Sequence, residues 1–167
     1  MAKHAVVRTD LLSGTTDGSQ LNSVIFYKDS NPAAIDNAQL VVLDEQLGRE
    51  TYKAVAPKAE STRKDLRLTA GVEMFYDQSR THYLTEWENE AGKPMRVYAL
   101  PTHGGFSATA EAFDKKPEKG KFVGFTAEST KITVQEAADD KTFGKVTSIE
   151  SSGYGEGRYE YYYITLV

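Results

Sequence analysis

The chain has 167 residues, no cysteine and a net charge of −4 at pH 7. This length suits about one domain with its own hydrophobic core, and the lack of cysteine excludes disulfides and thiolate metal sites. No apolar run approaches the ~20 residues of a membrane span, and the first residues lack the apolar stretch of a signal peptide. We therefore expect a domain that is neither embedded in a membrane nor secreted by the usual route.

Basic residues cluster only in "KKPEKGK", residues 115–121, where Glu118 interrupts them and the composition is that of a turn. Nucleic-acid-binding domains usually carry a continuous basic patch. We expect no contact with nucleic acid.

Short apolar or alternating segments, separated by turn residues, follow one another from residue 21 to the end. Strands are predicted, in chain order, at 21–29, 38–45, 49–56, 65–70, 94–100, 121–127, 130–137, 144–150 and 158–167. Residues 105–113 are predicted to be the end of a strand followed by one helical turn. The run 38–45 is almost wholly apolar, which indicates a strand buried on both faces. Strands at this spacing predict a mainly β fold, either a small barrel or a sandwich.

One segment shows helical spacing instead. Leu84, Trp87 and Ala91 lie three and four residues apart, and Gly92 follows them. This pattern favours one short helix within residues 79–91, closed by the glycine.

The segment "RYEYYYITLV", residues 158–167, is apolar on both faces. One face carries Tyr159, Tyr161 and Tyr163, and the other carries Tyr162, Ile164 and Leu166. Such a strand must be paired, because an unpaired apolar strand promotes aggregation. We interpret it as a core strand that completes a sheet. The alternative is an edge strand or tyrosine face that contacts another subunit, with Tyr159, Tyr161 and Tyr163 as the candidate contacts.

No recognisable catalytic motif is present. His4, His82 and His103 are far apart in the sequence and lack ligand spacing such as HExxH. "THGGF" at residues 102–106 has no GxSxG nucleophile motif to accompany it, and "GYGEG" at 153–157 precedes a strand rather than a helix. We expect no enzyme and no cofactor, although a metal site assembled only by folding stays open.

Several segments resemble a family of small proteins encoded beside the major capsid protein in tailed bacteriophages of Gram-positive hosts. They are "KHAVVRTDLLSGT", "GRETYKAVAP", the block beginning "VEMFYDQ", and "FSATAEAF" followed by "KGKFVGF". The resemblance covers residues 3 to about 126, and the tyrosine-rich closing strand agrees with it. Two glycines in "PTHGGF" depart from the more polar turn expected there.

The resemblance implies a virion structural protein of the capsid decoration (cement) type. Such a protein is made in the bacterial host cytoplasm, binds the major capsid protein on the outer surface of the assembled head, and stabilises the shell. The family carries no known catalytic residues. A homotrimer suits the threefold sites of a shell, and a monomer held only by the shell is the alternative.

Residues 1–20 are expected to form an extended N-terminal arm, and residues 21–167 a single mainly β domain. The arm has an apolar stretch followed by turn residues, and it could order on the capsid through Val6, Val7, Arg8, Leu11 and Leu12. The alternative is that these residues form a first strand in the domain's own sheet.

Two other functions stay open at this point. The chain could be another phage morphogenesis component, in the tail or the head–tail connector. It could also be a small inhibitor or binding protein directed at a host factor.

Overall fold

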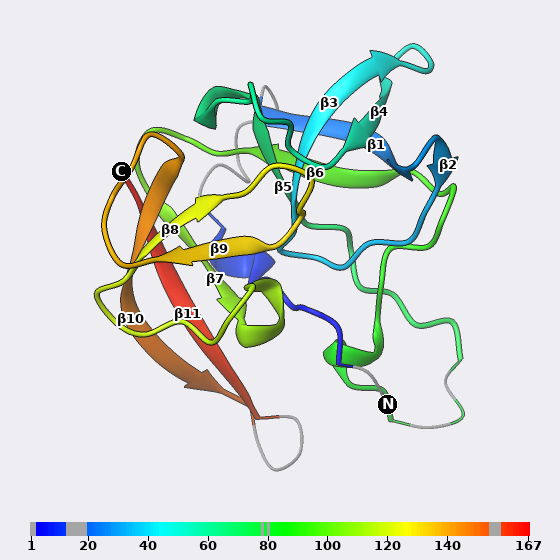
Figure 1. Ribbon diagram of the computed structural model, residues 1–167. Coiled ribbons are helices and arrows are strands. Elements are labelled where there is room, and N and C mark those ends of the chain that lie inside the picture. The colour runs from blue at the N-terminus through cyan, green and yellow to red at the C-terminus, as the bar shows by residue number, and fades with distance from the viewer. Residues whose placement is uncertain (1–2, 13–19, 78, 80, 154–157) are drawn as a thin grey trace.

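The computed structural model of the protein describes residues 3–12, 20–77, 79, 81–153 and 158–167. Two β-sheets account for most of its regular structure (Figure 1). The first contains β1 (Leu21–Lys28), β2 (Asn31–Pro32), β3 (Leu40–Gln46), β4 (Thr51–Val55), β5 (Leu66–Thr69) and β6 (Met95–Ala99). The second contains β7 (Gly105–Thr109), β8 (Phe122–Phe125), β9 (Ile132–Gln135), β10 (Thr142–Ser152) and β11 (Tyr159–Leu166).

The first sheet closes on itself. Its strand order is β2-β1-β4-β3-β5-β6, and β6 also pairs with β1. The strands β1, β4, β3, β5 and β6 therefore form a closed barrel, in which β1 and β4 run parallel and the other pairs are antiparallel. Closure leaves these five strands without a free edge, which removes a site for unwanted strand pairing.

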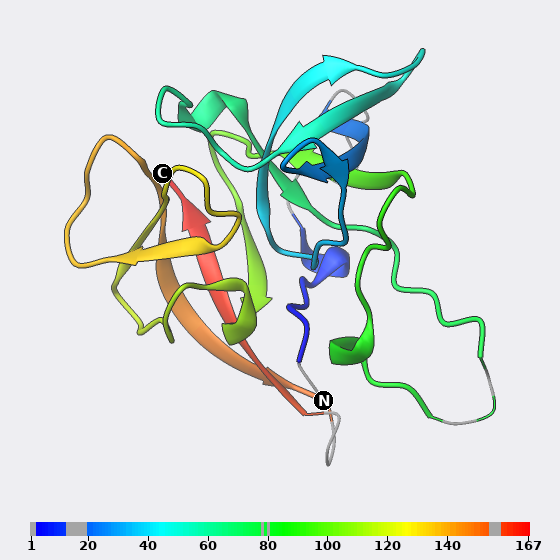
Figure 2. The ribbon, with the colours of Figure 1, turned by 45° about the vertical axis from the view of Figure 1, so that its right-hand side comes forward.

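The second sheet is antiparallel, with the order β7-β11-β10-β8-β9, and it packs beside the barrel (Figure 2). The prediction of a mainly β fold, a small barrel or sandwich, is confirmed. Every long strand predicted from the sequence forms, with bounds that differ by a few residues.

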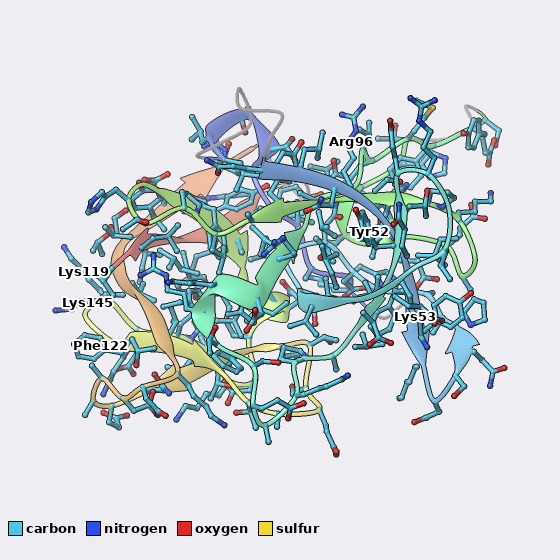
Figure 3. All side chains as sticks on the ribbon, turned by 90° about the horizontal axis from the view of Figure 1, so that it is seen from above. Tyr52, Lys53, Arg96, Lys119, Phe122 and Lys145 are labelled. Carbon is cyan, nitrogen blue, oxygen red and sulfur yellow. The ribbon has the colours of Figure 1, made fainter. Side chains whose placement is uncertain are left out.

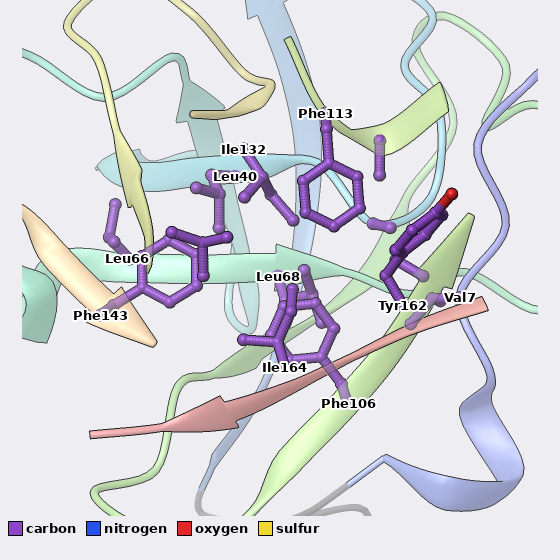
Figure 4. Close-up of a cluster of buried hydrophobic side chains, with 14 of the residues drawn as sticks. Val7, Leu40, Leu66, Leu68, Phe106, Phe113, Ile132, Phe143, Tyr162 and Ile164 are labelled. Atoms are coloured by element: carbon purple, nitrogen blue, oxygen red, sulfur yellow. The ribbon is translucent and has the colours of Figure 1, made fainter. Parts of the chain in front are cut away.

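Side chains of β3 point alternately to its two faces, so this strand contributes to two hydrophobic cores. Val41 points into the barrel, where it joins Val24, Phe26 and Ala54. Its neighbours on the opposite face belong to the larger cluster between the barrel and the second sheet, which Figure 4 shows in close-up. That cluster includes Leu40, Val42, Leu66, Leu68, Phe106, Phe143, Tyr162 and Ile164. Burial of β3 on both faces, as predicted, is confirmed for its first three residues.

The closing strand β11 lies in the interior of its sheet, between β7 and β10. Tyr162, Ile164 and Leu166 face the barrel within the large cluster. The interpretation as a core strand is confirmed, and the alternative of an edge strand is wrong.

The described helices are four 3₁₀ turns of three residues each: Thr9–Leu11 (η1), Arg63–Asp65 (η3), Leu84–Glu86 (η4) and Ala110–Ala112 (η5). Among the described residues, no helix is long and apolar enough to cross a membrane. The short helix predicted within residues 79–91 is reduced to η4. Trp87 already has extended dihedral angles, and Asn89 pairs with Ile35 as in an antiparallel sheet, so the chain cannot continue as a helix there.

The N-terminal segment, residues 4–12, belongs to the domain. Val7 bridges to Ala108, the amide of Arg8 donates to the carbonyl of Ser107, and the amide of Thr109 donates to the carbonyl of Val6. The segment thus adds to the free side of β7. The expected separate arm is wrong for these residues, and the alternative of a strand in the domain's own sheet describes them better. Residues 1–2 and 13–19 of the expected arm lie outside the described residues.

Candidate partner-binding surface

The candidate capsid contacts in the N-terminal segment are mostly inaccessible. Three of the five are buried, namely Val6, Val7 and Leu12. Leu11 is 50% exposed. The guanidinium of Arg8 lies 2.6 Å from the carboxylate of Asp10 and 5.8 Å from the ring centre of Tyr161. This ion pair lowers the pKa of Asp10. A partner could therefore reach Leu11 and the outer part of Arg8, but not the apolar stretch.

The three candidate tyrosines are largely engaged within the chain. Tyr161 is buried, and desolvation raises its pKa to about 12. The hydroxyl of half-buried Tyr159 accepts a hydrogen bond of 3.1 Å from the amide of Leu84. Tyr163 is also half-buried, and its phenol fills the space beside Gly105. Only the outer parts of Tyr159 and Tyr163 remain open to a partner.

A different segment exposes apolar side chains. Between β5 and β6 the chain leaves the barrel as a long loop, here called the loop 71–94, whose described residues are 71–77, 79 and 81–94. Figure 2 shows this part of the chain extending away from both sheets. Val72 and Met74 are each 55% exposed and Tyr76 is 84% exposed. They alternate with the half-buried Glu73 and Phe75, so the three lie on one side of an extended segment. Exposed apolar side chains that gather in one place are typical of a protein interface.

Two buried asparagines hold the base of this loop. The side chain of Asn37 accepts a hydrogen bond of 2.8 Å from the amide of Gly71 and donates one of 3.0 Å to the Gly71 carbonyl. It also donates to the carboxylate of Glu73. Asn89, near the other end of the loop, donates to the side-chain oxygen of Asn37 and to the carbonyl of Ile35. A side chain at position 71 would collide with Asn89, so the sequence requires glycine there. Both ends of the loop are therefore fixed at one point.

The outer part of the loop folds back on itself. The ring of Phe75 stacks on His82, with centroids 4.4 Å apart and an angle of 11° between the planes. The Nε2 of His82 donates to the carbonyl of Asp77, and Nδ1 lies 3.4 Å from the carboxylate of Glu86. The contact between Leu84 and Tyr159 then joins this part to β11. These contacts order much of the loop, although the 3₁₀ turn η4 is the one helix among its described residues.

The loop also lines a groove of about 630 Å³, here called the loop groove. Its other wall is formed by the first residues of β1, β4 and β6. Tyr52 and Arg96 line it, and Figure 3 labels both, whereas Lys53 projects from the other face of β4 toward Asp44 and Glu45. Trp87 and Met95 add apolar surface. Arg49, Glu50 and Arg96 all line the groove, so its rim carries charges of both signs. Apolar surface within a polar rim suits contact with a protein.

The sequence of residues 72–76 indicates an extended segment, a feature that the prediction of a helix within residues 79–91 leaves aside. Val72, Met74 and Tyr76 lie two residues apart, at the period of a strand, immediately before the residues with helical spacing, although the intervening Phe75 is also apolar. No family of known proteins, no curated protein and no solved structure matches the chain.

Proposed function

We propose that the chain is a virion structural protein, a capsid decoration (cement) protein that binds the outer surface of an assembled phage head and stabilises it. Its partner is the major capsid protein, and its location is the capsid surface after synthesis in the bacterial host cytoplasm. The observation that carries the proposal is the loop 71–94, which presents Val72, Met74 and Tyr76 to solvent. The resemblance of several sequence segments to phage head proteins is the reason for proposing the major capsid protein as the partner of this surface.

The structure of the loop suits binding to a preformed lattice. Its base is held by Asn37 and Asn89, so little conformational entropy is lost when the outer residues bind. The exposed apolar residues and the polar rim of the loop groove can contact a surface of mixed character at a boundary between capsid subunits. Binding across such a boundary stabilises the shell by mass action, because the protein binds the assembled lattice and not the separated subunits.

Quantification in purified virions tests the proposal. Mass spectrometry of heads and tails should find the chain in heads at a ratio close to that of the major capsid protein. A few copies in tails or connectors would favour another morphogenesis component. Absence from particles would favour a protein directed at a host factor. Either result would overturn the proposal.

A double variant in the loop, compared with a control variant elsewhere, tests whether the loop contacts the capsid. Replacing both Val72 and Met74 by serine removes exposed apolar surface without touching the core, so the fold should persist. We expect the double variant to bind undecorated capsids at least tenfold more weakly, about 1.4 kcal/mol, in co-sedimentation. Leu47→Ser is the matched control, because Leu47 is also exposed but lies in the connection between β3 and β4. Equal binding by the double variant and the control would place the contact elsewhere on the domain.

A further inference from the structure

Folding brings together three potential metal ligands that are far apart in the sequence. His4 comes from the N-terminal segment, Asp36 from the connection between β2 and β3, and Glu88 from the loop 71–94. One ligand atom from each lies within 4.8 Å of the others. Among the described residues, this is the group of histidine and carboxylate side chains that meets that distance.

The distances bracket those of a tetrahedral site. The Nδ1 atom of His4 is 2.7 Å from Oδ1 of Asp36 and 3.9 Å from Oε2 of Glu88. Zinc binds nitrogen and oxygen at about 2.0–2.2 Å, so neighbouring ligand atoms in a tetrahedral site lie roughly 3.4 Å apart. One observed distance is shorter than this and the other longer. Small side-chain rotations would place all three atoms around one ion.

Hydrogen bonds already orient His4 and Asp36. The amide of His4 donates to the carbonyl of Thr85 at 2.8 Å, which fixes the histidine backbone beside the loop. The second carboxylate oxygen of Asp36 accepts a hydrogen bond of 3.0 Å from the amide of Ala5. In metal sites, such a bond to the outer oxygen holds a carboxylate ligand in place.

The third ligand is positioned by main-chain pairing. Ile35 and Asn89 exchange two backbone hydrogen bonds, of 3.1 and 2.9 Å. Asp36 and Glu88 are their neighbours in the sequence, so the pairing brings both carboxylates to one place. The side chains of His4, Asp36 and Glu88 are 25%, 26% and 45% exposed, which leaves the group open to ions and to a water in a fourth position.

We propose that His4, Asp36 and Glu88 form a binding site for one divalent transition-metal ion, with zinc the best match. One imidazole and two carboxylates supply three ligands of the types that zinc takes, and water can complete the tetrahedron. Calcium needs six to eight oxygen ligands, which this group does not supply. The ion would join the N-terminal segment, the connection before β3 and the loop 71–94. Its ligands differ from Val72, Met74 and Tyr76, the loop residues proposed to contact the capsid.

Zinc titration of the untagged full-length chain tests the site. Trp87 is the only tryptophan and directly precedes Glu88, so its fluorescence reports on ion binding. We expect saturation at one zinc per chain and a higher melting temperature with zinc. Cobalt(II) should occupy the same site and give the visible absorption of a tetrahedral complex. The variant Glu88→Gln should bind zinc at least tenfold more weakly.

Glu88→Gln should weaken zinc binding without changing the fold. Glu88 is half-exposed and lies beyond hydrogen-bond distance of His4, so the melting temperature without zinc should stay close to that of the parent chain. His103→Ala is the control for adventitious binding, because His103 is exposed and outside the group. Unchanged zinc affinity in Glu88→Gln, or an equal loss in His103→Ala, would overturn the proposal. So would the absence of stoichiometric binding by the parent chain.

Discussion

Val7→Ala distinguishes an N-terminal segment that belongs to the core from an arm that is free in solution. Val7 is buried in the large cluster, and Figure 4 shows it beside Tyr162. The substitution removes two carbon atoms, each worth about 0.8 kcal/mol of burial, and leaves a small cavity in the large cluster. We therefore expect the free energy of unfolding to fall by about 2 kcal/mol. For a domain of this size the melting temperature should drop by roughly 4–8 °C.

Urea denaturation followed by the fluorescence of Trp87 measures the change, and circular dichroism gives an independent probe of the same transition. Leu11→Ala is the control, because Leu11 lies in the same segment but is half-exposed, and its substitution should change stability by less than about 0.5 kcal/mol. If Val7→Ala and Leu11→Ala were equally stable, the segment would not be part of the folded core and the reasoning would be refuted.

Two further predictions concern the second sheet. Gly105→Ala should destabilise the protein by roughly 1–3 kcal/mol, since a Cβ atom there would collide with the backbone of Ile164, whereas Gly48→Ala, in open space, should have little effect in the same urea assay. Stability should fall as the pH rises from about 10 toward 12, because unfolding lets Tyr161 ionise near its usual pKa while burial in the folded state raises that pKa to about 12. Burial raises the pKa of Tyr162 as well, so Tyr161→Phe should reduce this pH dependence of unfolding without abolishing it, whereas the exposed Tyr76→Phe should leave it unchanged. Equal slopes in both variants would contradict the contribution of Tyr161.

The strands were predictable because their pattern is local. In β5, apolar residues alternate at the period of a strand; β3 and β11 contain continuous apolar runs of strand length, and turn residues mark the ends. Closure of the first sheet was not predictable in this way. It depends on the register between β1 and β6, in which Val24 lies opposite Met95. Residues some seventy positions apart set that register, and no local pattern reports it.

The N-terminal segment shows the same limit. Its sequence suits both an arm and a strand, and the choice between them is made by hydrogen bonds to Ser107 and Thr109. The side-chain hydroxyl of Thr109 also accepts from the amide of Val6. These partners are about one hundred residues away in the sequence. Val6 and Val7, two of the candidate capsid contacts, are therefore buried in the folded chain and do not lie on its surface.

The loop 71–94 also depends on distant partners, and this links it to the N-terminal segment. Helical spacing at residues 84–91 favoured a helix, but the pairing of Asn89 with Ile35 requires an extended chain. The same stretch supplies the carbonyl of Thr85 to the amide of His4 and the amide of Leu84 to the hydroxyl of Tyr159. A partner that displaced this part of the loop would have to break both contacts. Binding that preserves them uses only the outward side of the loop, where Val72, Met74 and Tyr76 are exposed, and leaves the N-terminal segment in the core.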